Sequence, residues 1–269
     1  MPVRIVTDSS AGLPQEVVEE LGITVVGLHR MDIEGEATST SGLSALELTA
    51  AYARQLERGG DAGVVALHLS KELSSTWSAA VTAAGVFDES VVVIDTDTVG
   101  MAVGAAAMAA ARLAQDGASL QECADLAHDT LVRSHTWIYV HRIDELRKSG
   151  RISATTALLS TALATKPIMQ VHDGRIELAA KTRTQSKALA KLTELVVARA
   201  AGEPAFIAIQ QNEAKEAARV LEAQLRAGLG EESTIMILEM EKTLAVHTGP
   251  GALGVSAVFS APQEESAEK

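Results

Sequence analysis

The chain is poor in the residues that build several familiar kinds of site. It holds one cysteine, Cys123, among 269 residues, which excludes an intramolecular disulfide and a metal site built from several cysteines. Lys and Arg number 23 against 35 Asp and Glu, and the formal net charge is −12. Because binding to phosphate backbones requires clustered cations, we expect no nucleic-acid partner.

Long hydrophobic runs are also missing. The longest uncharged apolar run, residues 99–111, is well short of the ~20 residues that span a bilayer. The first eight residues lack the apolar core of a signal peptide. We therefore expect a cytoplasmic protein with no membrane span. No spacing of His, Asp and Glu indicates a metal, so we expect neither a metal nor a cofactor.

What the chain does have is apolar mass arranged as alternating strands and helices. Hydrophobic residues make up 47% of it, enough for one large or two modest cores. In the first half the strands are apolar throughout, which predicts a parallel sheet covered by helices on both faces. We expect strands at residues 3–7, 23–28, 63–69 and 91–94, a polar connection at 32–41, and helices at 14–21, 44–57, 75–86, 99–114 and 119–132.

The pattern changes after residue 134, where hairpins mix with helices. Asp173-Gly174 is a hairpin turn signal between two short strands. This predicts an N-terminal α/β domain at 1–133, a C-terminal α+β domain at 134–262 and a frayed tail at 263–269. We expect strands at residues 136–140, 167–171, 175–181, 205–210 and 234–241, and helices at 143–148, 155–164, 185–200 and between the last two strands.

Three hydroxyl-rich segments are candidate anion sites. They are Thr38-Ser-Thr-Ser41 ahead of a helix, Leu73-Ser-Ser-Thr-Trp77 after a strand, and His247-Thr-Gly-Pro-Gly251 after the apolar stretch 235–246. Hydroxyls, an imidazole and backbone N–H groups at strand ends suit holding a small anion such as a carboxylate. The ordinary alternatives remain open: a Ser/Thr-rich linker, a helix cap and a core histidine. Asp8-Ser9-Ser10 is equally well explained as a plain N-cap.

Two enzymatic interpretations fit less well. Leu73-Ser-Ser-Thr-Trp77 lacks both glycines of the Gly-x-Ser-x-Gly element that carries a hydrolase nucleophile. Gly249-Pro-Gly-Ala-Leu-Gly254 fits G-x-G-x-x-G literally, but too few residues follow it for a second strand and a ribose-binding acid. A small-molecule phosphotransferase or hydrolase using Asp8, Ser74 and His247 is kept as the alternative function.

Taken in order, the motifs resemble the DegV family, the fatty-acid-binding subunits of bacterial fatty-acid kinases. The resemblance covers nearly the whole chain, although glycine is usual in the family at the position of Ser75 and the segment between Val26 and Thr40 is shorter here. The matching elements are Val6-Thr-Asp-Ser-Ser10, Thr40-Ser41, Leu73-Ser-Ser-Thr-Trp77, Val93-Ile-Asp-Thr96, Ile143-Asp-Glu-Leu-Arg-Lys-Ser-Gly-Arg-Ile-Ser153, Lys166-Pro-Ile168, Asp173-Gly174, Lys181-Thr-Arg183 and His247-Thr-Gly-Pro-Gly251.

The resemblance implies a lipid-binding protein that performs no chemistry itself. One long-chain fatty acid would lie in a cleft between the two domains, and a separate kinase subunit would phosphorylate it. Two arginines, Arg151 and Arg183, would help the kinase to dock. The carboxylate would be held by Thr40, Ser41, Ser74 and His247, with Thr76 close by. A sensory or structural domain that is merely stabilised by lipid is a third hypothesis.

Overall fold

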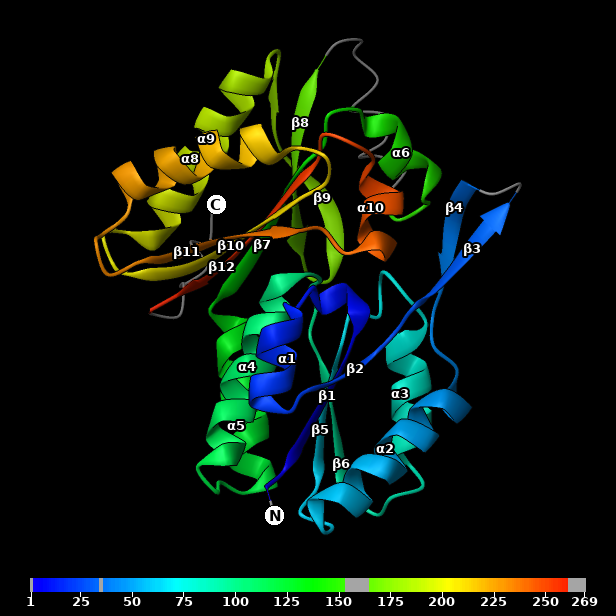
Figure 1. The fold of residues 1–269 in the computed structure, drawn as a ribbon. Helices are drawn as coiled ribbons and strands as arrows, with labels where there is room; N and C mark the ends of the chain where they lie inside the picture. Colours follow the sequence, from blue (N-terminus) through cyan, green and yellow to red (C-terminus); the bar gives the residue numbers. More distant parts are fainter. Residues whose placement is uncertain (1, 34–35, 153–164, 261–269) are drawn as a thin grey trace, which may run out of the picture.

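The computed structural model describes residues 2–33, 36–152 and 165–260. Two separate β-sheets stand one above the other, each with its own helices (Figure 1). The chain completes the first sheet before it starts the second at Ser134. The expected fold class, a parallel-sheet α/β part followed by an α+β part, is confirmed. The domain division at 133/134 stays a prediction, and the expected tail lies outside the described residues.

The N-terminal sheet is made of β1 (Arg4–Asp8), β2 (Thr24–Val26), β5 (Val64–His68) and β6 (Val91–Asp95). The strands run parallel in the order β2-β1-β5-β6. Alternate side chains point to opposite faces, so Val65 and Leu67 join one apolar cluster and Val64 and Ala66 another. Every residue of β5 is buried, because helices cover both faces of the sheet.

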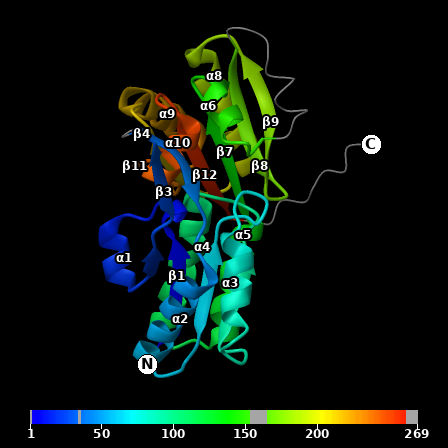
Figure 2. The same ribbon diagram turned by 90° about the vertical axis from the view of Figure 1, so that its right-hand side faces the viewer.

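Two layers of helices cover this sheet (Figure 2). One contains α1 (Gln15–Leu21), α4 (Met101–Gln115) and α5 (Leu120–Val132), and the other contains α2 (Ala45–Gly59) and α3 (Thr76–Ala84). Most residues of α4 are buried, since the helix contacts the N-terminal sheet, α5 and the C-terminal sheet. Its alanines let all three neighbours approach closely.

A two-stranded hairpin projects from the N-terminal sheet toward the upper part of the molecule (Figure 1). It consists of β3 (His29–Ile33) and β4 (Glu36–Ser41), which pair antiparallel. The prediction of a polar connection at 32–41 is therefore wrong. It failed because the hairpin belongs to neither main sheet, and strands of that kind need no regular alternation of apolar residues.

The C-terminal sheet has six strands in the order β11-β10-β12-β7-β8-β9. Among these six described strands, β10 and β11 are the one parallel pair, and the other neighbours are antiparallel. One face packs against α8 (Gln185–Ala200) and α9 (Lys215–Gly228) around a second apolar core. The strands are β7 (Ser134–Tyr139), β8 (Lys166–His172), β9 (Arg175–Thr182), β10 (Ala205–Gln211), β11 (Thr234–Glu239) and β12 (Leu253–Phe259).

Two C-terminal elements differ from the sequence expectation. The strand expected at 234–241 forms as β11 and ends at Glu239, but a helix that the sequence did not predict, α10 (Lys242–Thr248), follows it. Strand β12, which the sequence did not predict, lies in the middle of the sheet between β10 and β7. A further short helix, α6 (Ile143–Lys148), forms as expected. The expected helix at 155–164 lies outside the described residues.

Candidate functional site

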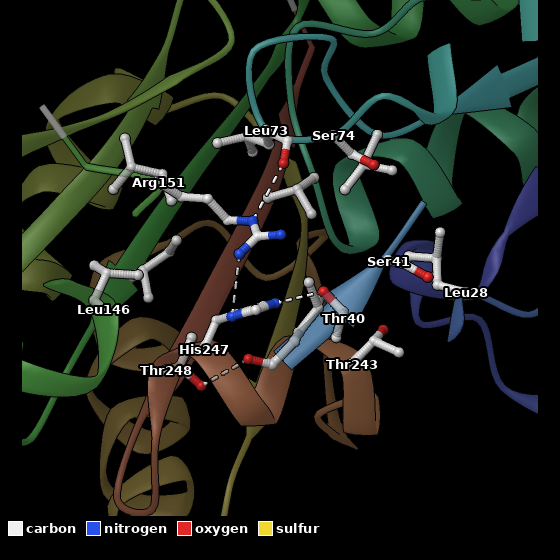
Figure 3. Close-up of a pocket in the computed structure, with 15 residues that line it drawn as sticks. Leu28, Thr40, Ser41, Leu73, Ser74, Leu146, Arg151, Thr243, His247 and Thr248 are labelled. Atoms are coloured by element: carbon white, nitrogen blue, oxygen red, sulfur yellow. Dashed lines mark hydrogen bonds between the residues drawn. The ribbon is translucent and has the colours of Figure 1, made fainter. Parts of the chain in front are cut away.

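A pocket lies where the two halves of the molecule meet (Figure 3). Its apolar wall includes Leu28 and Leu73 from the N-terminal half and Ile138, Ile176 and Leu244 from the C-terminal half. Its cavity is about 60 Å³, below the ~300 Å³ typical of the smallest ligand pockets, so a long ligand enters only if lining side chains move. The polar groups that line it are Thr40, Ser41, Ser74, Arg151, Thr243, His247 and Thr248.

His247 reaches this pocket from the last turn of α10, not directly from a strand as expected. The turn after it is fixed by Asn212, whose Nδ2 donates to the carbonyl of Gly249 at 2.7 Å. Burial first, and then the charge of Arg151, lowers the pKa of His247 to about 4. The imidazole is therefore neutral at neutral pH.

The hydrogen bonds of His247 determine which ring nitrogen carries the proton. Nη1 of Arg151 lies 3.5 Å from Nδ1, and a guanidinium can only donate, so Nδ1 accepts. The ring proton is then on Nε2, which donates to Oγ1 of Thr40 at 2.7 Å. Since Thr40 accepts from His247, its own hydroxyl proton is free to donate to a ligand.

Arg151 places a positive charge in the pocket. Its Nε donates to the carbonyl of Leu73 at 3.2 Å and its Nη1 to the carbonyl of Ser149 at 2.9 Å. Burial lowers the pKa of the guanidinium, although an arginine remains charged at neutral pH. The sequence offered Arg151 for docking of a partner; the structure places it beside His247 (Figure 3). Its docking role stays a proposal.

Ser74 and Thr76 have different places. The hydroxyl of Ser74 lines the pocket, whereas Thr76 is fully buried and is not among the lining residues. Their oxygens lie 3.0 Å apart, and Oγ1 of Thr76 accepts from the backbone N–H of Leu43 at 3.2 Å. A Cβ on Gly42 would come within 3.0 Å of both hydroxyls. Thr76 therefore holds the end of β4, which carries Ser41, against Ser74.

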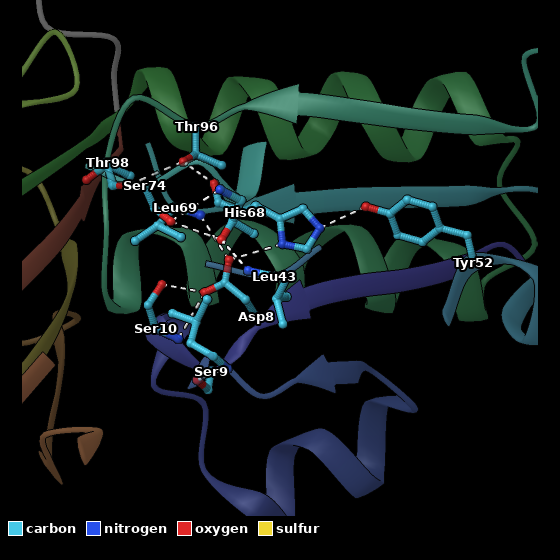
Figure 4. Close-up of polar contacts among 12 residues, drawn as sticks. Asp8, Ser9, Ser10, Leu43, Tyr52, His68, Leu69, Ser74, Thr96 and Thr98 are labelled. Carbon is cyan, nitrogen blue, oxygen red and sulfur yellow. Dashed lines mark hydrogen bonds and ion pairs between the residues drawn. The ribbon is translucent and has the colours of Figure 1, made fainter. Parts of the chain in front are cut away.

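A buried polar network anchors the loop that leads to Ser74 (Figure 4). Asp8 accepts from the backbone N–H of Leu69 and from Nδ1 of His68, both at 3.0 Å. Nε2 of His68 in turn forms a hydrogen bond with the hydroxyl of Tyr52 at 2.9 Å. Burial and the nearby Asp8 raise the pKa of Tyr52, which keeps this hydroxyl protonated. Asp8 also accepts from the backbone N–H of Ser10, so its predicted capping role is confirmed.

The alternative catalytic set is not hydrogen-bonded together in the described part of the chain. Asp8 bonds to Ser10, His68 and Leu69, all deep in the N-terminal half. Ser74 bonds to Thr76, and His247 bonds to Thr40 and Arg151. A serine nucleophile needs a base within hydrogen-bond reach, and no such contact exists here. Gly254, the last glycine of the G-x-G-x-x-G match that the sequence context argued against, lies inside β12.

Two further observations concern the remaining candidates. Arg183 is exposed just before α8 and does not line the pocket. Among the described residues, no group of three or more His, Cys, Asp or Glu is placed to hold a metal. Nor does any described helix have the length and apolar character to cross a membrane.

Sequence reasoning missed the hydroxyl of Thr243 and gave no separate role to that of Thr248, which lies in the predicted segment 247–251; α10 brings both to the pocket. The available signal was Glu241, whose carboxylate accepts from the backbone N–H of Thr243 at 2.6 Å and so caps the helix. An acidic residue two positions before a threonine and followed by an apolar run is compatible with a helix start.

Fold and pocket together define an α/β protein with two main sheets and, where its two halves meet, an apolar cavity that carries hydroxyls, a neutral imidazole and a guanidinium. A family model described as "Uncharacterised protein, DegV family" matches residues 28–260. The chain belongs to the DegV family. A DegV domain-containing protein of Corynebacterium glutamicum is 69% identical over 261 residues, covering 97% of this chain and 95% of that protein.

Solved structures of DegV family proteins have the same fold as this chain. A crystal structure of a DegV family protein from Corynebacterium glutamicum superimposes with a TM-score of 0.95 at 67% identity, covering 98% of this chain and all (100%) of that one. A DegV family protein from Thermus thermophilus, described by its fatty-acid binding, gives 0.88 at 28% identity, with coverage of 96% and 100%. DegV of Bacillus subtilis, described as a fatty acid binding protein, gives 0.84 at 27% identity, with coverage of 97% and 100%.

Proposed function

We propose that this protein binds a long-chain fatty acid in the pocket between its two halves. The observation that carries the proposal is the pairing of an apolar wall with Thr40, Ser74, His247 and the charge of Arg151. Each methylene buried in the wall contributes ~0.8 kcal/mol. An ionised carboxylate costs several kcal/mol to bury unless donors replace its water. The Thermus and Bacillus relatives, whose descriptions name fatty-acid binding, support the same assignment.

In this proposal the carboxylate accepts hydrogen bonds from the hydroxyls of Thr40, Ser41 and Ser74. His247 acts through Thr40, because its Nε2–H orients the threonine hydroxyl. Arg151 supplies the opposite charge. Because the cavity measures only about 60 Å³, the acyl chain displaces apolar lining side chains on entry.

The test is to extract the purified protein with organic solvent and identify the bound molecule by mass spectrometry. One long-chain fatty acid per chain is the expected result. Delipidated protein is then titrated calorimetrically with a series of saturated acids, and affinity should rise with chain length. Extraction of a nucleotide or sugar phosphate, or affinity independent of chain length, would overturn the proposal.

We further propose that the bound acid is presented to a separate kinase subunit, which forms the acyl phosphate. Arg183 is a candidate contact because it is an exposed cation on a chain of net charge −12. Charge reversal at such a site slows association more than it changes the fold. Arg183→Glu should leave fatty-acid affinity unchanged and reduce phosphorylation by the cognate kinase. Arg219→Glu, on the exposed face of α9, is the matched control. Normal turnover with Arg183→Glu would refute this contact.

A further inference from the structure

A second cavity lies away from the first, between α4 and the C-terminal sheet. One wall comes from α1, α4 and α5 and the other from β10, β11 and β12. Its volume is about 530 Å³, within the ~300–1,000 Å³ of small-molecule sites. Among the residues that the structure describes, it shares no lining residue with the first pocket. We call it the α4 groove; its principal side chains are Val17, Met108, Arg112, Phe206 and Met236.

The apolar part of the α4 groove is a continuation of the main core that reaches the surface. Val17, Phe206 and Met236 pack against that core but remain partly exposed. Met108 lies beside them at 8% exposure. Two methionines and a phenylalanine make an adaptable wall, because thioether side chains adjust to the shape of an apolar ligand. The wall is therefore suited to a flexible hydrocarbon chain.

The charge at the rim of the groove is not balanced. Arg112 lines the groove, is exposed, and has no ion pair or side-chain hydrogen bond with any residue that the structure describes. The neighbouring cation, Arg133, is already paired with Asp129 at 2.8 Å and donates to the carbonyl of Phe259. An unpaired guanidinium beside an apolar trough, in a chain of net charge −12, is complementary to an anionic group on an apolar tail.

We propose that the α4 groove is a second ligand site, for a free single-chain amphiphile with one anionic group. The anion pairs with Arg112, and the chain lies against Met108 and Met236. The site does not depend on the function proposed for the first pocket. The two cavities lie at different points along α4: Val99, just before the helix, lines the first, whereas Met108 and Arg112, further along it, line the second.

The NMR signals of the methionine methyl groups can detect ligand binding in each of the two cavities separately. The chain has seven methionines, whose methyl carbons are labelled with carbon-13 and assigned with Met108→Leu, Met169→Leu and Met236→Leu. Met169 packs with Leu73 and Ile138, which line the first pocket, so its signal reports on that pocket. Delipidated protein is titrated with decanoate below its micellar concentration, and separately with decan-1-ol.

The expected result is saturable movement of the Met108 and Met236 signals with decanoate. Arg112→Ala should weaken this binding about fivefold, as befits an exposed ion pair, and should not change the response to decan-1-ol. Arg219→Ala, on α9, should have no effect. Unmoved Met108 and Met236 signals overturn the proposal, even if Met169 moves. An equal response to both compounds, or no effect of Arg112→Ala, overturns the anionic specificity. If the Met108 and Met236 signals shift while the Met169 signal does not, the ligand site in the α4 groove is supported. That result counts only against ligand binding in the first pocket.

Discussion

Replacing Arg151 by methionine separates a role inside the pocket from a role in partner docking. Methionine keeps much of the length of the side chain and removes the charge. The guanidinium lies beside His247 and is half-buried. Hydrogen bonds to charged groups contribute about 1.5–3 kcal/mol. Since Arg151 retains contact with solvent, we expect the lower part of that range, a loss of about 10- to 30-fold in fatty-acid affinity.

The assay is calorimetric titration of delipidated Arg151→Met with a long-chain fatty acid. Arg151 also helps to lower the pKa of His247, so its removal raises that pKa. The titration is therefore run above the ordinary histidine pKa of about 6.5, where the imidazole stays neutral in both proteins. Arg183→Met, an exposed cation outside the pocket, is the control and should bind normally. Equal affinities for Arg151→Met and the parent would refute the placement of this charge at the carboxylate.

Three more predictions follow from the contacts of the site. Ser74→Ala should weaken fatty-acid binding by about 1 kcal/mol in the same titration, whereas Ser75→Ala, whose exposed hydroxyl lies outside the pocket lining, should not. Gly42→Ala places a Cβ within 3.0 Å of the Ser74 hydroxyl. It should lower the free energy of unfolding in urea by about 1–3 kcal/mol and weaken fatty-acid binding. If neither value changed, the close approach would be contradicted. Burial lowers the pKa of His135 and His247 to about 4. Between pH ~6.5 and ~4 the unfolded chain therefore holds more protons than the folded one. The free energy of unfolding decreases as the pH is lowered through this range, by at most about 1.4 kcal/mol per pH unit for each histidine. We expect a smaller contribution to this pH dependence from His247, which is partly exposed. In urea unfolding, the free energy of unfolding of His135→Gln should change less with pH than that of the parent.

The sequence alone determined the elements whose signals are local. The strands of the N-terminal sheet were visible as short apolar runs, because burial on both faces leaves no polar alternation. The capping serines Ser44 and Ser119 marked the starts of α2 and α5, since each is followed three residues later by glutamate. Residue type and position at element ends marked the hydroxyls of Thr40 and Ser74 as candidates for anion binding, and both line the pocket.

The tertiary structure decided what depends on distant partners. Strand β12 contains Gly254 and Ala257, weak strand formers, and it exists because β10 and β7 pair with it on both sides. The orientation of Arg151 toward His247 depends on α10, which is remote in sequence. Likewise, His68 links the side chains of Asp8 and Tyr52 only after β1, β5 and α2 have packed. Local patterns specify elements through short-range sterics and hydrogen bonding, whereas the polar contacts of the pocket depend on how those elements pack.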